Sequence, residues 1–167
     1  ETLAKLPPVF KKDGGVTAGN ASGIVDGGAA IVLASGAAAE AHSATPIGVL
    51  RAWAVVGVDP AYMGMGPAPA IRAVLSKTGL ALADIDLFEI NEAFAAQYLS
   101  VEAELGLDRD RVNVNGGAIA IGHPLGMSGT RLMITLLNEL RRRGRTRGIA
   151  SACIGGGQGI AALIETV

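Results

Sequence analysis

Cysteine is almost absent from this sequence: Cys153 is the only one among 167 residues. A single cysteine excludes an intrachain disulfide and a zinc site built from several thiolates, and it fits a reducing compartment. No metal site is expected. Aromatic residues make up 4% of the chain and charged residues 17%, so the core must consist mainly of aliphatic side chains. The net charge of -1 gives no general attraction to nucleic acid or to an anionic membrane.

Long apolar runs and a recognisable leader are also missing. No stretch reaches the roughly 20 residues that a membrane span needs, and no signal peptide is visible. Half of the residues are nevertheless hydrophobic, and 24 are glycine. This composition indicates a packed domain with tight turns and is too apolar for a disordered chain. The chain opens at Glu1 without a methionine, which suggests a processed product or part of a longer protein.

Hydrophobic patterning predicts alternating strands and helices. Strands are expected at 28–35, 47–58, 85–90, 112–114, 148–154 and 159–165. Helices are expected at about 69–78, 91–105 and 127–143, with a turn or two of helix at 37–43. From the second strand onward this order predicts an α/β domain, a layered α/β/α arrangement around a mixed five-stranded sheet. The polar, Gly-rich residues 1–24 are expected to form a connecting arm.

Three polar stretches lie at the predicted ends of these elements. The first is NEAF at 91–94, where Asn91 follows a strand and is expected to cap the next helix, with Glu92 in its first turn. The second is GGAIAIGHPLGMSGTR at 116–131. There, Pro124 keeps His123 out of helical geometry and places its imidazole at a helix N-terminus, which favours the neutral base. A purely structural cap and a purely structural histidine are the alternatives.

The third stretch is ACIGGGQG at 152–159. Cys153 ends an apolar strand, and the glycines after it would let a ligand approach backbone N–H groups closely, as an oxyanion site requires. A buried cysteine before a tight hairpin is the alternative. Taken together, a base, a thiol, an amide and free N–H groups at strand ends indicate a catalytic site on one rim of the sheet. A papain-like hydrolase would use similar residues, but a helix would then be expected after the cysteine.

Other polar or sulfur-containing residues are weaker candidates. The arginines at 141–147 are expected to be a solvated helix end that complements the helix dipole, with an anion-binding patch as the alternative. His42 is expected at the surface. Met63 and Met65 could line an apolar pocket or simply fill the core.

At these stretches the chain resembles the thiolase family. Two further segments, TAGNASGIVDGGAA at 17–30 and GVDPAYMGMGP at 57–67, match that family as well, so the resemblance covers nearly the whole chain. The opening KLPPVFKKDG is most similar to 3-ketoacyl-CoA thiolases of fatty-acid oxidation, and acetyl-CoA acetyltransferases share much of it. The resemblance implies breakage or formation of 3-ketoacyl-CoA thioesters, with coenzyme A as a substrate and no separate cofactor.

The resemblance also implies a role for each candidate residue. His123 would activate a nucleophilic cysteine and help to bind the thioester oxygen, and Cys153 would act as the acid and base. Asn91 would hold a water that completes an oxyanion hole with His123. The Gly155 N–H would serve a second hole. Substrate would be bound by three further residues: Ser22 at the pantetheine arm, and Met63 and Phe94 at the acyl pocket.

The family uses two cysteines, and this chain carries only the one that matches the acid/base position. The nucleophile would therefore lie in a preceding N-terminal thiolase segment, and the isolated chain is expected to lack thiolysis activity. Residues 1–43 would be the end of the loop domain and the last strand of the N-terminal domain, and 44–167 the C-terminal domain. A dimer or tetramer is implied for the complete protein. The bacterial cytoplasm, or a mitochondrion or peroxisome in a eukaryote, is the implied location. A non-catalytic CoA-binding or interaction module with this fold is the alternative function.

Overall fold

A four-stranded mixed sheet forms the centre of the computed structural model, which describes residues 1–167. Across the sheet the strands are β1 (Gly48–Gly57), β4 (Gln158–Thr166), β3 (Arg147–Ile154) and β2 (Leu87–Ile90). β4 runs antiparallel to both of its neighbours, whereas β3 and β2 are parallel. Parallel pairing brings the carboxyl ends of β2 and β3 to the same edge of the sheet. The polar stretch 91–94 follows β2 there, and the glycines at 155–157 follow β3.

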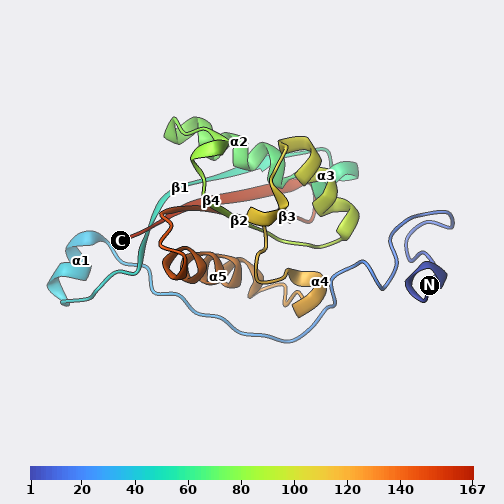
Figure 1. Ribbon diagram of the computed structural model, residues 1–167, viewed down its shortest axis with the longest axis horizontal. Coiled ribbons are helices and arrows are strands. Elements are labelled where there is room, and N and C mark those ends of the chain that lie inside the picture. Colours follow the sequence, from blue (N-terminus) through green and yellow to red (C-terminus); the bar gives the residue numbers. More distant parts are fainter.

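Helices cover both faces of the sheet. The α-helices are α1 (Gly36–Ala41), α2 (Pro67–Thr78), α3 (Ala95–Leu105), α4 (Ala118–Ile121) and α5 (Ser128–Arg142). Short 3-10 helices are η1 (Leu3–Lys5), η2 (Pro60–Met65), η3 (Leu82–Asp84) and η4 (Arg109–Arg111). Figure 1 shows α2 and α3 on one side of the sheet and α5 on the other. The α/β class and the layered arrangement are therefore confirmed.

Side-chain alternation along β2 divides the core into two clusters. Phe88 and Ile90 join the cluster under α2, together with Ile71 and Ile149. Leu87 instead joins the leucines of α5 on the opposite face. The polar residues Glu89 and Asn91 follow Leu87 at spacings of two, and both contact the segment that includes α5. The side chains of Glu89 and Asn91 therefore point to the face of the sheet that α5 covers, near the start of that helix.

The fifth strand, expected at 112–114, does not form. Val112 makes only an isolated bridge to Phe88, because Asn113 adopts a positive φ of 47° that turns the chain away. The Asn113 amide then bonds to both backbone groups of Ile90 at 2.8 Å. One side chain therefore satisfies the end of β2 where a strand was predicted.

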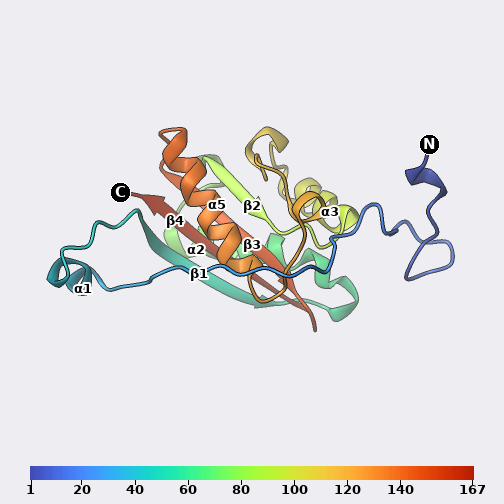
Figure 2. The same cartoon turned by 90° about the horizontal axis from the view of Figure 1, so that it is seen from below.

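The strand predicted at 28–35 is also absent. This segment is extended but has no strand partner, and Val32 is 93% exposed. Figures 1 and 2 show the segment from 23 to 35 running past α4 and α5 on its way to α1. An extended segment with apolar side chains on both sides is buried only when other strands or helices pack around it. No strand of this chain pairs with this segment, so its side chains stay exposed.

Asn91 does not cap a helix, contrary to the prediction. α3 begins four residues later, with Phe94 in the N-cap position. The turn before α3 is held instead by Gln97, whose Oε1 accepts hydrogen bonds from the N–H groups of Ala93 (3.0 Å) and Phe94 (3.4 Å). Asn91 continues the direction of β2, with its N–H bonded to the Ser151 carbonyl oxygen at 2.9 Å.

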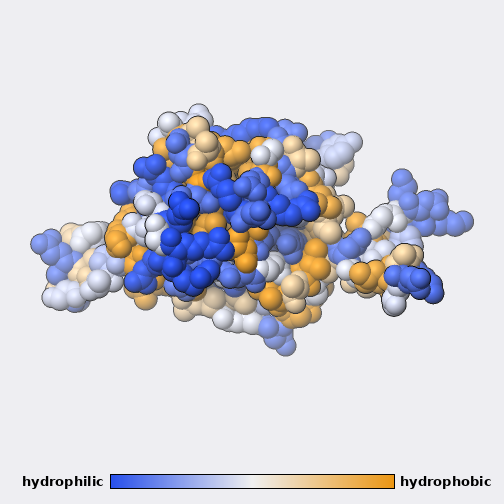
Figure 3. All heavy atoms as spheres, in the orientation of Figure 1, coloured by the Kyte–Doolittle hydropathy of each residue, from blue (hydrophilic) through white to orange (hydrophobic).

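On one face of the sheet, β1 is left without a helical cover. α5 packs on β2, β3 and β4, while α2 packs on the other face against β1, β3 and β4. Ala54 points to α2 and is buried, but its neighbours Trp53 and Val55 are 59% and 54% exposed. Figure 3 shows that another face is hydrophilic at its centre, with apolar surface along its sides. None of the helices has the length and apolar character needed to cross a membrane.

Candidate active site

The candidate site begins at the shared carboxyl edge of β2 and β3. Ile90 pairs with Ser151 at the end of the parallel ladder, so Asn91 and Cys153 each lie just beyond that pair. Asn91 is 1% exposed, and Cys153 is half-buried. The topology therefore brings the predicted amide and the predicted thiol to one edge, although they are 62 residues apart in the chain (153 - 91).

His123 reaches this edge from the loop between α4 and α5. Gly122 has a φ of +92°, and Pro124 follows His123, so the backbone cannot continue the α4 helix through the histidine. The His123 N–H donates to the Gly23 carbonyl oxygen at 2.9 Å. A side chain at Gly122 would overlap Val25. The N-terminal arm thus fixes the backbone from which the imidazole projects.

The imidazole lies between two hydrogen-bonding side chains. Its Nε2 is 3.2 Å from Asn91 Nδ2, and its Nδ1 is 2.6 Å from Ser128 Oγ. Asn91 Oδ1 is buried without a hydrogen-bond donor among the protein atoms. The structure therefore brings together His123 and Asn91, as predicted, and leaves one acceptor of the amide available for a further donor.

Burial lowers the pKa of His123, and the positive charge of Arg131 lowers it further. Both effects disfavour the imidazolium, so the neutral imidazole expected of a general base predominates near pH 7. Arg131 itself is anchored by Glu89, with 2.9 Å between Nη1 and Oε2. Burial raises the pKa of Glu89 to about 7, because lost hydration outweighs the attraction of Arg131. The sequence predicts this effect from the dipole of the helix after His123, whereas in the structure burial is the largest cause and the charge of Arg131 adds to it.

Glu92 fixes the loop that leads to His123. Its carboxylate accepts hydrogen bonds from Asn113 Nδ2 at 3.1 Å and from the Ile119 N–H at 3.2 Å. Gly117 lies against it, and a Cβ there would displace the Glu92 carboxylate from this position. The prediction that Glu92 would sit in the first turn of the α3 helix is therefore wrong. It holds the start of α4 instead.

Cys153 forms no hydrogen bond with His123 or Asn91 in this structure. It lies in the antiparallel part of β3 and pairs with Gly159. Burial raises the pKa of its thiol, which keeps the sulfur protonated near neutral pH. A strand and a hairpin surround this cysteine, so the helix that a papain-like nucleophile would require is absent.

Because its pKa is raised and its surface is partly covered, Cys153 is expected to react slowly with iodoacetamide. At pH 8 the native chain should be alkylated severalfold more slowly than the same chain unfolded in urea. Intact mass measured over time follows this reaction cleanly, since the chain has one thiol. A native rate equal to the unfolded rate would contradict the assignment of a protonated, shielded thiol.

The glycines after Cys153 have two different structural roles. Gly155 is exposed, its N–H makes no intramolecular hydrogen bond, and space is open where a Cβ would be. Gly157 and Gly159 instead allow close backbone packing, because a Cβ at either would overlap a carbonyl oxygen, that of Val58 or of Gly66. Gly155 therefore has the free N–H that the prediction requires. Gly157 and Gly159 instead allow the backbone on either side of η2 to pack closely against the hairpin.

The three predicted substrate-binding residues surround the start of α3. Ser22 donates its hydroxyl to the Ala93 carbonyl oxygen at 3.1 Å. Phe94 packs edge-on against Phe10, with ring centroids 5.5 Å apart. Met63 lies half-buried in η2, which packs against α3. Ser22 and Phe94 are thus close together, because Ser22 bonds to Ala93, the residue before Phe94. Met63 lies in η2, the element that packs against α3. Met65 joins the core cluster beneath α2.

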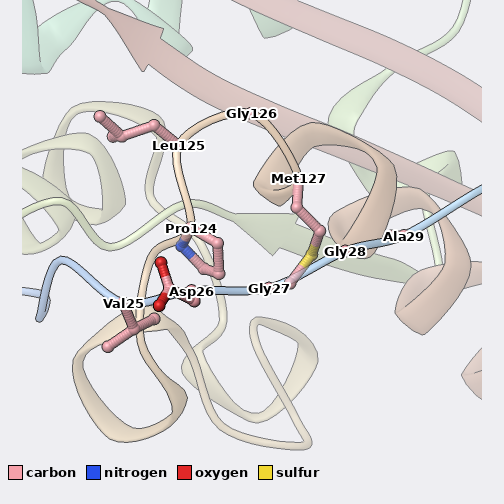
Figure 4. Close-up of a pocket in the computed structure, with 9 residues that line it drawn as sticks. All are labelled: Val25, Asp26, Gly27, Gly28, Ala29, Pro124, Leu125, Gly126 and Met127. Carbon is pink, nitrogen blue, oxygen red and sulfur yellow. The ribbon is translucent and has the colours of Figure 1, made fainter.

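A cavity of about 300 Å³ lies beside the loop that carries His123 (Figure 4). Its walls are the extended residues 25–29 and the turn 124–127. A side chain at Gly27 would overlap Pro124 and Met127, so the two walls are packed closely at one point. Asp26 points into the space between them, and Leu125 points away (Figure 4). Asp26 is the only titratable side chain in its lining, and neither His123 nor Cys153 contributes to it, so the cavity is separate from the candidate active site.

The arginines at the end of α5 lie at the opposite edge of the sheet. Arg142 and Arg143 both pair with the buried Glu139, and these guanidinium groups hold the pKa of that carboxyl at about 2. Arg145 approaches Asp86 at 3.9 Å. Much of the local positive charge is therefore neutralised within the chain. His42 is exposed, as predicted, at the end of α1.

Sequence reasoning missed the residues that support His123 from behind. Ser128 and Glu89 are buried and Arg131 is largely covered, and these polar groups contact the imidazole or one another. The detectable signal is Glu89, a charged residue in the middle of a short apolar strand. Such a residue is almost never fully buried without a partner. The Ser128 contact has no comparable signal, because it depends on how the loop folds back.

Comparison with known proteins identifies the family. The model "Thiolase, C-terminal domain" matches residues 44–166, and "Thiolase, N-terminal domain" matches residues 1–37. The chain belongs to the thiolase family. It is 59% identical to the mitochondrial 3-ketoacyl-CoA thiolase of Pongo abelii over 166 residues. It is 57% identical to the acetyl-CoA acetyltransferase of Escherichia coli K12 over 165 residues. Each alignment covers 99% of this chain and 42% of the relative.

The structure agrees with this membership. The crystal structure of human mitochondrial 3-ketoacyl-CoA thiolase in complex with CoA superimposes with a TM-score of 0.93 at 54% identity, covering 99% of this chain and 42% of that one. The thiolase fold predicted from the motifs is therefore confirmed. The thiolase chain described here spans about two-fifths of the length of the relatives that it matches, so it contains only part of what those proteins contain.

Proposed function

We propose that this chain is the C-terminal part of an acyl-CoA C-acyltransferase that cleaves 3-ketoacyl-CoA with coenzyme A, or runs the reverse Claisen condensation. The observation that carries the proposal is the bond between His123 and Asn91 at the edge of the sheet where β3 ends, one residue after Cys153. Coenzyme A is a substrate, and no resident cofactor is required. Relatives named 3-ketoacyl-CoA thiolase and acetyl-CoA acetyltransferase support this activity.

The proposed thiolysis divides between two parts of the protein. A cysteine in the N-terminal part loses its proton to His123 Nε2, and its sulfur bonds to the 3-keto carbon. The bond between that carbon and the α-carbon then breaks, and its electron pair moves into an acetyl-CoA enolate. Cys153 donates its proton to the α-carbon, giving acetyl-CoA. The protonated thiol indicated by the raised pKa of Cys153 suits this acid step.

The second half of the reaction reverses the role of Cys153. Its thiolate takes the proton from the thiol of an incoming coenzyme A, whose sulfur attacks the acyl-enzyme thioester. The shortened acyl-CoA leaves, and the nucleophilic cysteine recovers its proton from His123. One thiol thus acts first as acid and then as base, so it returns to its starting state at the end of each turnover.

Two groups of this chain would stabilise the oxyanions that form on the way. Asn91 Oδ1 is a buried acceptor without a protein donor, which suits it to hold a water that shares an oxyanion with His123. The unpaired N–H of Gly155 would donate to a second oxyanion. Each such donor is typically worth about 3 kcal/mol of transition-state stabilisation. Ser22, Met63 and Phe94 would contact the pantetheine arm and the acyl group.

We propose that an N-terminal thiolase segment completes this chain, with residues 1–43 belonging to that neighbouring part and 44–167 forming the C-terminal domain. The exposed apolar segment 28–35 and the uncovered face around Trp53 and Val55 support the proposal, since surfaces of this kind are normally buried by a partner. The complete protein would be a dimer or a tetramer. A bacterial cytoplasmic or a mitochondrial location agrees with the sources of its relatives.

A fusion of this chain behind the N-terminal three-fifths of the Escherichia coli acetyl-CoA acetyltransferase tests the proposal. The fusion is expected to cleave acetoacetyl-CoA with coenzyme A, whereas the 167-residue chain alone is expected to be inactive, because it has no second cysteine. Cys153→Ala in the fusion should lower turnover by about 100-fold or more, since it removes the acid/base group.

The control is Cys153→Ser, which keeps the shape of the side chain but is a far weaker acid. It should be nearly as inactive as the alanine variant. Full activity of a soluble Cys153→Ala fusion would refute the assigned role. An inactive but correctly folded unsubstituted fusion, judged by circular dichroism and gel filtration, would refute the proposed activity.

A further inference from the structure

The surroundings of His123 leave a choice between two tautomers of its neutral ring. The proton can lie on Nδ1, which faces Ser128 Oγ at 2.6 Å, or on Nε2, which faces the Asn91 amide at 3.2 Å. Only the first tautomer leaves an Nε2 lone pair on the side where β2 and β3 end. The choice therefore decides whether the imidazole can accept a proton there.

Ser128 is the first residue of α5, and its hydroxyl is almost fully buried, with 3% of the residue exposed. A hydroxyl has one proton to donate. The Pro124 carbonyl oxygen lies 2.9 Å from Ser128 Oγ in donor geometry. When the proton is used there, Oγ can only accept from the ring, so Nδ1 must carry hydrogen.

The Asn91 side agrees with this assignment. With hydrogen on Nδ1, Nε2 is an acceptor, and the Asn91 amide donates one hydrogen to it, which leaves Oδ1 and the second amide hydrogen unpaired. The opposite tautomer would require Asn91 Oδ1 to face the ring. Both hydrogens of its NH2 group would then be without acceptors in a side chain that is 1% exposed, and the Ser128 bond to Pro124 would be lost. Buried unpaired donors are costly, so the first arrangement is favoured.

We propose that Ser128 is a positioning residue that holds His123 as the Nδ1–H tautomer and so points a basic Nε2 toward the site. Arg131, which pairs with Glu89, lies on the same side of the sheet and disfavours the cation without selecting a tautomer. The catalytic value of this arrangement rests on the function proposed above, but the tautomer itself does not.

Long-range proton–nitrogen NMR correlations of the ¹⁵N-labelled chain test the tautomer directly. Only two histidines are present, and His42→Gln removes the other signal. The unsubstituted chain at pH 8 is expected to show hydrogen on Nδ1 of His123. Ser128→Ala should move the population toward Nε2–H, while Ser128→Thr, which keeps a hydroxyl, should largely restore Nδ1–H. Ser151→Ala is the matched control, since Ser151 is equally buried and its hydroxyl bonds to Ile160 instead.

In the active fusion, Ser128→Ala is expected to lower kcat by about tenfold or more with little change in KM for coenzyme A, because a misplaced proton affects the base and not substrate binding. An Nε2–H signal in the unsubstituted chain would overturn the proposal even if the alanine variant failed to fold. An unchanged tautomer in a folded Ser128→Ala chain would do the same. Loss of fusion activity in the unsubstituted protein would count against the proposed function and leave the NMR result standing.

Discussion

Replacing His123 by alanine is expected to reduce thiolysis by the fusion about 1,000-fold or more. The imidazole serves twice in the proposed reaction, as the base for the nucleophilic cysteine and as a donor to an oxyanion. General base catalysis is typically worth 10² to 10⁴ in rate, and one oxyanion donor about 10² to 10³. Initial rates of acetoacetyl-CoA cleavage at saturating coenzyme A measure the effect.

His42→Ala is the matched control for this substitution. It removes the only other imidazole, which is exposed at the end of α1, and should leave the rate within twofold. A His123→Ala fusion that is folded and retains more than about a tenth of the activity would be inconsistent with a catalytic imidazole at this position. Binding of coenzyme A should change little, because the assigned contacts to the pantetheine arm lie elsewhere.

Arg131→Met is expected to destabilise the chain by about 3–5 kcal/mol, the usual cost of removing one partner of a buried ion pair. Glu89 is 2% exposed and loses its only cationic partner in this variant. Urea unfolding followed by circular dichroism measures the change. Arg72→Met is the matched control, because the Arg72–Glu104 pair is about half exposed at both ends. That variant should lose less than about 1 kcal/mol.

The cost of Arg131→Met should depend on pH in a definite direction. Burial raises the pKa of Glu89 from 4.5 to about 7 in the folded protein. Between these values the folded state binds more protons than the unfolded state, so this group makes the protein less stable as pH rises. Without Arg131 the pKa rises further, and the loss extends to higher pH. The variant should therefore be penalised more at pH 8 than at pH 5. An equal penalty at both values would exclude Glu89 as its source.

The elements that pack by simple periodicity could be predicted from the sequence. β1 and the hairpin of β3 and β4 were expected within one or two residues of their observed bounds. α5 was expected from leucines spaced four apart, and it buries all three of them, Leu132, Leu136 and Leu140. In each case the pattern and the burial have the same origin, a single apolar face against one sheet.

The failures occur where a side chain replaces a backbone partner or where the partner lies outside the chain. The Asn113 amide satisfies the end of β2 and makes a fifth strand unnecessary, and no local propensity reports such a bond. The segment 28–35 has the composition of a buried strand but no neighbour to pair with. Strand formation is a property of pairs, so a correct local pattern can still give an extended, exposed segment.

The sequence allowed the candidate residues of the site to be named, but not the hydrogen bonds and ion pairs that hold them in place. His123 was found because Pro124 and Gly122 interrupt a helix, and Asn91 because it follows a buried strand. The Ser128 and Arg131 contacts depend on the turn at 124–127, whose path is set by packing against the arm. Geometry of this kind arises only once distant segments meet.

The close backbone contact between Gly66 and Gly159 has a consequence for how selectivity could evolve. A Cβ at Gly159 would overlap the Gly66 carbonyl group, so the segment bearing Met63 and the hairpin bearing Gly155 are packed backbone against backbone. On the function proposed here, Met63 contacts the acyl group, and the Gly155 N–H stabilises an oxyanion. A change in the position of one is therefore expected to shift the other. Variants chosen for a longer substrate by reshaping Pro60–Met65 should therefore seldom keep their original speed on the short one.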